Sequence, residues 1–240
     1  MTACLFDLDG VMTQTAKVHS AAWKQMFDDY LRERAGRSGE AFVPFDPIRD
    51  YDQYVDGRPR YDGVRAFLTS RRISLPEGDP EDAPQTETID GLGNRKNEIV
   101  LRLIREQGVQ PYDGSVRYVE AVRSSGLRRA VVSSSTNCRE VLAAAGIQGL
   151  FEGVIDGVVA ERQHLHGKPA PDTFLAGARA LGVEPAQAVV YEDALAGVQA
   201  GRAGHFGFVV GVDRVGQADA LRAHGADRVV DDLAELLETP

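Results

Sequence analysis

Cysteine is scarce in this sequence, and no hydrophobic run approaches the length of a membrane-spanning helix. The chain has two cysteines: Cys4 lies in a short apolar run and Cys138 in a stretch with helical spacing. We therefore expect buried thiols in a reducing compartment rather than a disulfide. A membrane helix needs about 20 apolar residues, and acids begin at position 7, where a signal peptide would be apolar. These absences predict a cytoplasmic protein with no membrane partner.

An excess of basic residues is also lacking. The 27 Lys and Arg residues are outnumbered by 36 Asp and Glu residues, which gives a net charge of −9. This balance argues against a nucleic-acid partner, although a local basic pocket could still bind a small anion. The length of 240 residues allows one large domain, or one core with a smaller appendage. We expect a monomer or weak dimer.

The rest of the chain is organised around its first stretch, Ala3–Val11, in which an apolar run ends in Asp7, Asp9 and Gly10. On an extended strand, residues two apart point to the same side, so the two carboxylates are expected to emerge together. Crowded carboxylates share a proton or bind a cation, and Mg²⁺ suits such oxygen ligands. An ordinary strand that ends in an Asp-Gly turn remains an alternative for this motif alone.

Beyond residue 110, short apolar runs alternate with amphipathic helices. This texture predicts an α/β fold with a doubly wound parallel sheet covered on both faces, to which the first strand also belongs. The strands are expected at 129–133, 153–156, 188–191, 206–212 and 228–230. The helices are expected at 114–124, 137–145, 172–181, 194–203, 217–224 and at the C-terminal end.

The block between the first strand and residue 108 has no strand-like alternation, so we expect a helical insertion. The expected helices cover 14–34, 62–70 and 94–106, and the loops cover 36–52 and 75–87. These ranges predict a core formed by 1–14 and 108–240, with a helical cap formed by 15–107. An insertion at this place can act as a lid that excludes water from an active site.

In parallel α/β sheets, ligands bind beyond the carboxyl ends of the strands, and polar residues gather at those places here. The turn 133–137 offers hydroxyls and backbone N–H groups, although it could be an ordinary helix N-cap. The proline-rich loop 167–172 holds Lys168, which alone could be a solvated lysine. A second acidic pair, Glu192 and Asp193, ends a later strand. Together with the first acidic pair they predict a site for a cation and a phosphate.

The order and spacing of these motifs resemble the haloacid-dehalogenase superfamily of phosphotransferases. The stretches that carry the resemblance are Asp7-Leu8-Asp9-Gly10-Val11, Ser133, Lys168-Pro169-Ala170-Pro171-Asp172, and Glu192-Asp193 with Gly197. The resemblance implies that Asp7 is a nucleophile that forms an aspartyl-phosphate and that Asp9 is a general acid/base. It implies that Ser133 and Lys168 hold the phosphoryl group. It also implies Mg²⁺ bound by Asp7, the Asp9 carbonyl and Asp193, with Glu192 in support.

The insertion has polar features of its own. His19 and Trp23 are four residues apart, on one face of the first expected helix. Two glycine-framed basic stretches, 56–63 and 93–97, are expected to be a loop and a helix-opening turn that form a second anion site. The alternatives are a surface imidazole and solvated loop charges.

This insertion resembles the cap of the β-phosphoglucomutase family, whose members interconvert β-glucose 1-phosphate and glucose 6-phosphate through a bisphosphate. The resemblance implies a phosphosugar substrate and a clamp for its distal phosphate. The implied substrate-binding residues are Thr15, His19, Trp23, Arg60, Lys96 and Asn137. A mutase needs two phosphate sites at once, and the paired basic stretches favour it. A sugar-phosphate phosphatase on the same scaffold remains an alternative, as does a non-catalytic binding module.

Overall fold

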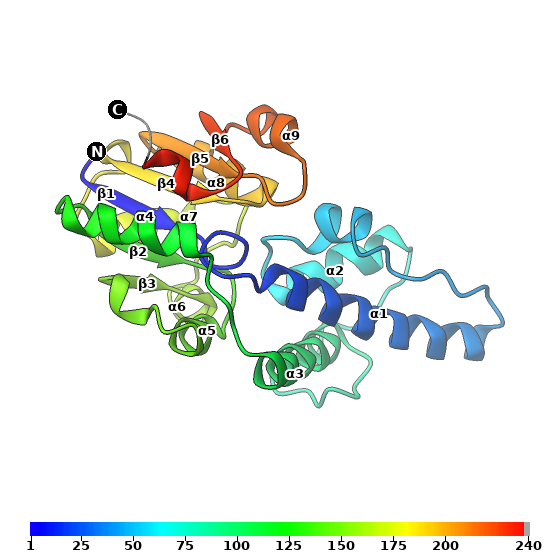
Figure 1. Ribbon diagram of the computed structural model, residues 1–240. Coiled ribbons are helices and arrows are strands. Elements are labelled where there is room, and N and C mark those ends of the chain that lie inside the picture. The colour runs from blue at the N-terminus through cyan, green and yellow to red at the C-terminus, as the bar shows by residue number, and fades with distance from the viewer. Residues whose placement is uncertain (238–240) are drawn as a thin grey trace. The chain divides into compact units, whose positions relative to one another are not determined.

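The computed structural model describes residues 1–237, which form two compact units. The first unit contains Met1–Thr15, Gly57–Pro59 and the chain from Val109 onward, and we call it the core unit. The second contains Ala16–Asp56 and Arg60–Gly108, and we call it the cap unit. Figure 1 follows the chain through both. Among the described residues, no helix is both long enough and apolar enough to cross a bilayer.

The core unit is built on a parallel sheet that, within residues 1–237, has six strands in the order β3-β2-β1-β4-β5-β6. The strands are β1 (Ala3–Phe6), β2 (Arg128–Val132), β3 (Gly153–Ile155), β4 (Ala188–Glu192), β5 (Phe208–Val212) and β6 (Arg228–Val230). The expected doubly wound sheet is thereby confirmed. The strand order reverses between β1 and β4, which is where open α/β sheets form their ligand crevice.

Helices connect the strands of the core unit. They are α4 (Asp113–Ser124), α5 (Cys138–Ala144), α6 (Gly157–Arg162), α7 (Asp172–Ala180), α8 (Leu195–Ala203) and α9 (Ala218–Ala223). Short 3₁₀ turns are η2 (Gln148–Leu150), η3 (Pro185–Gln187) and η4 (Leu233–Leu236). The helix expected at the C-terminal end is, within the described residues, the short 3₁₀ helix η4: Asp232 caps it through Ala234 N, and Leu237 N closes on Ala234 O at 3.0 Å. That three-residue closure is the 3₁₀ spacing.

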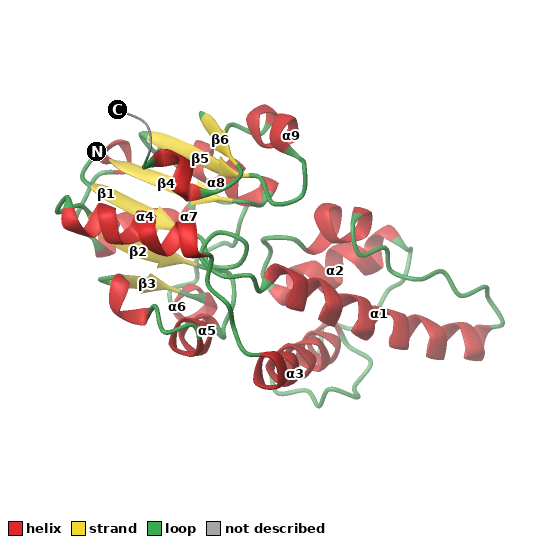
Figure 2. Cartoon of the chain, viewed as in Figure 1, coloured by secondary structure: helices red, strands yellow, loops and turns green. Residues whose placement is uncertain are grey.

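Alternation along the strands divides the buried side chains between the two faces of the sheet. Leu5 of β1 and Val190 of β4 join the cluster that includes Phe174 of α7. The next residues along, Phe6 and Tyr191, stack at 4.5 Å on the opposite face, on the side of α4, which crosses in front of the strands in Figure 2. Because side chains alternate between the two faces, the apolar pattern of each strand also determines on which face of the sheet the polar residue at its end lies.

The cap unit is helical, with its own aromatic core. Its helices are α1 (Ala16–Ser38), α2 (Arg60–Ser70) and α3 (Ile89–Gln107), and a π-helical segment, η1, covers Tyr51–Val55. Phe27 of α1 lies with its ring centroid 5.3 Å from that of Trp23, 5.2 Å from that of Phe45 and 4.1 Å from that of Phe67. Such packing of aromatic rings contributes strongly to the stability of a small helical unit.

Two expectations about the cap are wrong, for one shared reason. The stretch 93–97 is not a turn that opens a helix, because α3 begins at Ile89 and contains it. The stretch 56–63 is a loop only in part, because α2 begins at Arg60. The glycines are there for close packing: a Cβ at Gly93 would lie 2.5 Å from the Tyr61 ring, and one at Gly63 would lie 3.2 Å from Trp23. A glycine inside a helix was misread as a turn signal.

Candidate active site

The register of the sheet brings Asp7 beside Glu192. Leu5 pairs with Val190 and Phe6 with Tyr191, and Asp7 N donates to Tyr191 O at 2.9 Å. One further step along both chains places the two carboxylates together at the carboxyl end of the sheet. Both side chains are buried, with residue exposures of 7% and 1%, so they need a compensating charge.

Lys168 supplies that charge. Its Nζ donates to Asp7 Oδ1, to Glu192 Oε1 at 2.5 Å and to Val132 O at 3.4 Å. Burial disfavours the ammonium, but the Asp7 and Glu192 carboxylates outweigh it and hold the pKa of Lys168 above its usual range. The lysine that the proline-rich loop was expected to aim at the site is therefore a buried ammonium, held by hydrogen bonds to three oxygens.

The acidic residues of the site outnumber this one lysine. Asp7, Glu192 and Asp193 offer carboxylate oxygens that all lie within 4.8 Å of one another. Burial raises the pKa of the Asp7 carboxyl, and the neighbouring Glu192 and Asp9 charges raise it further, whereas Lys168 opposes the rise. A hard cation bound at this cluster would relieve the repulsion, so the residues present suit a divalent metal with oxygen ligands.

Two glycines make room for the acidic side chains. A Cβ at Gly10 would lie 1.8 Å from Asp193 Oδ2, and one at Gly197 would lie 1.8 Å from Glu192 Oε1. Gly10 also has φ +84°, which favours glycine. Glu192 is further fixed because its Oε2 accepts from Ala194 N at 2.8 Å. With one oxygen on Lys168 and the other on this amide, Glu192 orients its neighbours, whereas Asp7 and Asp193 are better placed to bind a cation.

Asp9 follows β1 in a turn rather than on the extended strand that the two-residue spacing predicted, although its charge lies near enough to Asp7 to raise the pKa of that carboxyl. Strand β1 ends at Phe6, and the chain turns so that Gly10 N donates to Thr13 O at 2.8 Å. Asp9 Oδ1 accepts a hydrogen bond from Thr15 Oγ1, and Thr15 Oγ1 lies 2.8 Å from Thr13 Oγ1. The Asp9 carboxylate is therefore outside the acidic cluster and is held by a buried hydroxyl pair. Thr13 was missed because nothing in its local sequence marks it.

The hydroxyl-rich turn follows β2. Ser133 N donates to Ile155 O at 2.9 Å, and Ser133 Oγ accepts from Ser135 N at 3.1 Å. Asn137 N donates to Ser135 Oγ at 3.2 Å, just before α5 begins. Ser133 is buried, and its hydroxyl proton can be donated to an anion at the strand end. Ser134 Oγ donates to Gly57 O at 2.9 Å, which ties the segment Gly57–Pro59 into the core unit.

Within the cap unit, Lys96 of α3 meets two residues of α1. Its Nζ lies 2.9 Å from His19 Nδ1 and 4.8 Å from the centroid of the Trp23 ring. Because an ammonium only donates, His19 Nδ1 must accept, which assigns the ring proton to Nε2. The expected face shared by His19 and Trp23 is therefore present, and it also presents a buried lysine.

Arg60 stands at the start of α2, in a second polar group of the cap unit. Its Nη2 donates to Tyr61 Oη at 3.0 Å, and its guanidinium lies 4.8 Å from the centroid of that ring. Tyr61 Oη in turn donates to Asn94 Oδ1 at 2.9 Å. Arg95, by contrast, donates its Nε to Pro84 O at 2.7 Å, so it serves the loop beside α3.

Two further residues were missed by sequence reasoning. Arg214 Nε donates to Gly10 O at 2.8 Å, and Gln217 Nε2 donates to Asp193 O at 3.1 Å. They reach the loops that carry the acidic residues from the segment after β5. Because each acts on a backbone carbonyl far away in the sequence, no motif could reveal them.

Known proteins resemble this chain along nearly its whole length. A β-phosphoglucomutase of Mycobacterium tuberculosis is 59% identical over 98% of this chain and 91% of that protein. Fructose-1-phosphate phosphatase YqaB of Escherichia coli is 30% identical over 83% of this chain and 90% of that protein. The crystal structure of a β-phosphoglucomutase from Clostridium difficile has a TM-score of 0.77 and 27% identity, covering 98% of this chain and 93% of that one. The family described as haloacid dehalogenase-like hydrolase matches residues 1–205. The chain belongs to this family.

Proposed function

We propose that this protein is a β-phosphoglucomutase, a phosphomutase that interconverts β-D-glucose 1-phosphate and glucose 6-phosphate. The proposal depends above all on the 59% identity with the mycobacterial relative of that name across nearly all of both chains. The buried arrangement of Asp7, Lys168, Glu192 and Asp193 supports it, because phosphoryl transfer requires positioning and positive charge more than any other contribution.

Asp7 is the nucleophile in this proposal. Its carboxylate attacks the phosphorus of the substrate, which gives an aspartyl-phosphate and divides one difficult displacement into two. Lys168 holds the attacking carboxylate and neutralises charge on the phosphoryl oxygens, while Ser133 and Asn137 donate to them. Mg²⁺, held by Asp7, Asp193 and the Asp9 carbonyl, would supply the positive charge that offsets repulsion between Asp7 and a phosphate dianion.

Asp9 moves the proton. It protonates the leaving sugar oxygen in one half-reaction and removes a proton from the accepting hydroxyl in the other. The hydrogen bond from Thr15 to Asp9 Oδ1 supports this role, because a carboxylate that accepts from a hydroxyl here can also accept from a sugar hydroxyl. Thr15 thereby connects the acid/base to the start of α1.

The cap unit selects the sugar phosphate. In the proposed mutase, Arg60 binds the phosphate that is not being transferred, through a two-point contact, and Lys96 binds the sugar with His19 and Trp23 beside it. A bisphosphate intermediate needs both anion sites during one reaction cycle. The ordered contacts of Lys96 with His19 and of Arg60 with Tyr61 support preformed binding groups.

An anomer-resolved assay tests the proposal. The protein is given either β- or α-glucose 1-phosphate with Mg²⁺ and a trace of the β-glucose bisphosphate, and phosphorus NMR follows the products. We expect glucose 6-phosphate from the β anomer only. Glucose 6-phosphate from neither anomer, under conditions in which the mycobacterial relative turns over, would overturn the proposal.

A sugar-phosphate phosphatase is the second candidate, because the E. coli relative named fructose-1-phosphate phosphatase is 30% identical. Both functions would use Asp7, and they differ in whether water or a sugar hydroxyl receives the phosphoryl group. The ratio of inorganic phosphate to glucose 6-phosphate in the same spectra separates them. A ratio far above one would identify a phosphatase.

A further inference from the structure

The segment between β5 and α9, residues 213–217, contacts both loops that carry the acidic cluster. Arg214 Nε donates to Gly10 O at 2.8 Å, and Gln217 Nε2 donates to Asp193 O at 3.1 Å. We call residues 213–217 the bridging loop. It follows a strand next to β4 and lies outside the residues 1–205 that match the family.

The bridging loop is fixed at its start by Asp213. The Oδ1 atom of this residue accepts from Val215 N at 3.1 Å, Gly216 N at 2.7 Å and Gln217 N at 2.9 Å. These hydrogen bonds lower the pKa of Asp213 against the effect of burial, which raises it. An aspartate whose side chain accepts from three successive backbone N–H groups makes a loop of defined shape.

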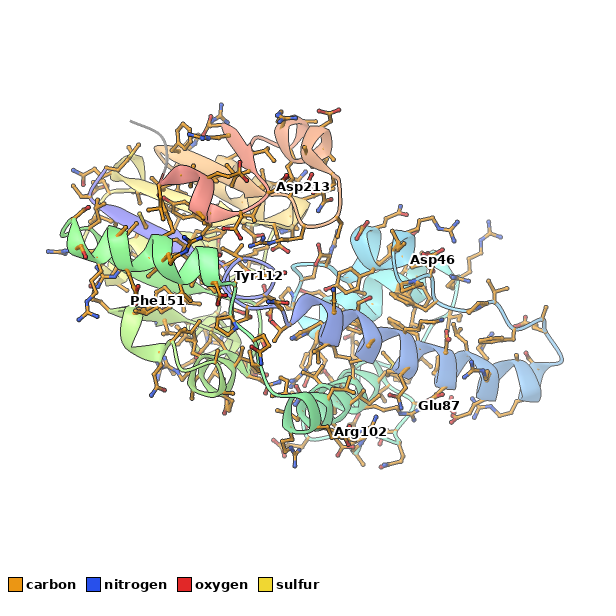
Figure 3. The ribbon with its side chains drawn as sticks, viewed as in Figure 1. Asp46, Glu87, Arg102, Tyr112, Phe151 and Asp213 are labelled. Atoms are coloured by element: carbon orange, nitrogen blue, oxygen red, sulfur yellow. The ribbon has the colours of Figure 1, made fainter. Side chains whose placement is uncertain are left out.

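Arg214 is fixed on its other sides as well. Its guanidinium lies 3.6 Å from the centroid of the Tyr112 ring, and Nη1 donates to Asp231 O at 2.7 Å. Figure 3 labels Asp213 at the start of the bridging loop and Tyr112 where the chain enters α4, near the loop after β1. Arg214 thus links the C-terminal part of the core unit to the Gly10 carbonyl through hydrogen bonds at both places.

The two contacts act on the geometry of the acidic cluster. Gly10 is bound at both ends, because its N–H donates to Thr13 O at 2.8 Å and its carbonyl accepts from Arg214. Gly10 also has Asp193 directly against it, so a shift of either loop changes the spacing of the carboxylates. Outer groups that orient ligands commonly change metal affinity by about 10- to 100-fold when they are removed.

We propose that Arg214 and Gln217 are positioning residues that set the affinity of the acidic cluster for a divalent cation. This inference rests on the metal site of the proposed function. It differs from an electrostatic role of Arg214, since removing a nearby positive charge would tighten cation binding, whereas loss of positioning weakens it. Gln217 is uncharged, so its replacement tests positioning without that opposing effect.

The test is equilibrium binding of Mn²⁺ to the full-length protein without substrate, measured by electron paramagnetic resonance of the unbound ion. Gln217→Met keeps the length of the side chain and removes the donor, and Gln199→Met on the exposed face of α8 is the matched control. We expect about tenfold weaker binding for Gln217→Met, unchanged binding for the control, and the same circular dichroism for both. Arg214→Met is expected to weaken binding as well.

The outcomes separate this inference from the proposed function. Equal Mn²⁺ affinity for Gln217→Met and Gln199→Met would overturn the positioning role even if the wild-type protein binds the ion well. Tighter binding by Arg214→Met would assign that residue an electrostatic role instead. No Mn²⁺ binding by the wild-type protein would remove the metal site itself, and with it both proposals. If Arg214→Met does not fold, Gln217→Met still decides.

Discussion

In the core unit, the acidic site residues lie at the ends of strands and Lys168 in the loop between α6 and α7, whereas in the cap unit the polar site residues lie on helices α1, α2 and α3. Asp7 and Glu192 continue β1 and β4, and their neighbours in the sheet fix their positions through the strand register. Lys96 and His19, by contrast, come from two helices that pack together through one apolar cluster. The Asp7 and Glu192 carboxylates both contact the Lys168 ammonium, and the register of neighbouring strands fixes their positions more closely than helix packing would.

The two units also differ in the groups that surround their buried lysines. Lys168 is buried and forms ion pairs with both Asp7 and Glu192, so its charge would lose its partners only if both carboxylates were removed. Lys96 Nζ lies 4.8 Å from the centroid of the Trp23 ring and 2.9 Å from His19 Nδ1, so a ring face and an imidazole take part in binding this cation. The comparison indicates that substitutions in the core unit abolish the chemistry, whereas those in the cap unit change which substrate is used.

The sharpest test of this contrast is Asp7→Asn in the core unit. We expect turnover to fall on the order of 10⁶-fold, as when other catalytic nucleophiles are removed. Thermal unfolding should not shift to lower temperature, because burial and two acidic neighbours already disfavour the Asp7 charge. Turnover is measured by phosphorus NMR and stability by circular dichroism. Activity within tenfold of wild type would refute a covalent route through Asp7.

A cap substitution, Arg60→Ala, should have a smaller and more selective effect. Losing a two-point contact to phosphate is expected to lower mutase turnover about 100-fold. Hydrolysis of acetyl phosphate, which has no distal phosphate, should change little. Arg60→Lys is the matched control, since it keeps the charge and loses the fork geometry. Equal losses with both substrates would show that Arg60 binds no distal phosphate.

The third test returns to the core unit, at Gly197 of α8. A Cβ there would lie 1.8 Å from Glu192 Oε1, so Gly197→Ala must displace the carboxylate that orients Lys168. We expect about a tenfold loss of turnover, with destabilisation of about 1–3 kcal/mol from overpacking. Gly149→Ala has open space around the new methyl group and serves as the control. Equal activity of the two variants would mean that Glu192 can move without consequence.

Much of the core unit could be predicted from sequence, because short apolar runs reveal strands and their parity. The acids that follow those runs could therefore be assigned to one end of the sheet, and the proline-rich loop with Lys168 was assigned to the same end. The turn around Asp9 could not, since it depends on a left-handed Gly10 and on hydroxyls at Thr13 and Thr15. Nor could Arg214, whose partner Gly10 lies 204 residues away.

The cap unit was harder to predict for a local reason. Glycines at 63 and 93 were taken as turn signals, whereas they are small residues where a ring of another helix approaches. The start of α3 did carry a signal: Thr88 precedes the apolar residue Ile89, and its Oγ1 accepts from Gly91 N at 2.9 Å. An N-cap depends only on residues close in sequence, so Thr88 before Ile89 is a signal from which the start of α3 can be predicted.

The smallest expected effect tests the N-cap residue Thr88 of α3, the helix that carries Lys96. Thr88→Ala removes the acceptor for Gly91 N and should cost about 1 kcal/mol of stability. Thr88 Oγ1 also donates to Asp82 at 2.6 Å, and this hydrogen bond lowers the pKa of Asp82. A lowered pKa contributes stability above the unfolded value of about 3.9 and loses it as the pH falls through the folded value.

The stability difference between wild type and Thr88→Ala should therefore be largest near neutral pH and shrink as the pH falls through the lowered pKa of Asp82, below which only the lost N-cap remains. Urea unfolding at a series of pH values measures it, and Thr88→Ser, which keeps both hydrogen bonds, should match wild type throughout. A difference that does not vary with pH would assign the whole effect to the helix start and none to Asp82. Unchanged turnover per folded molecule would show that α3 presents Lys96 through packing with α1, whereas a loss would show that its first turn also holds Lys96 in place.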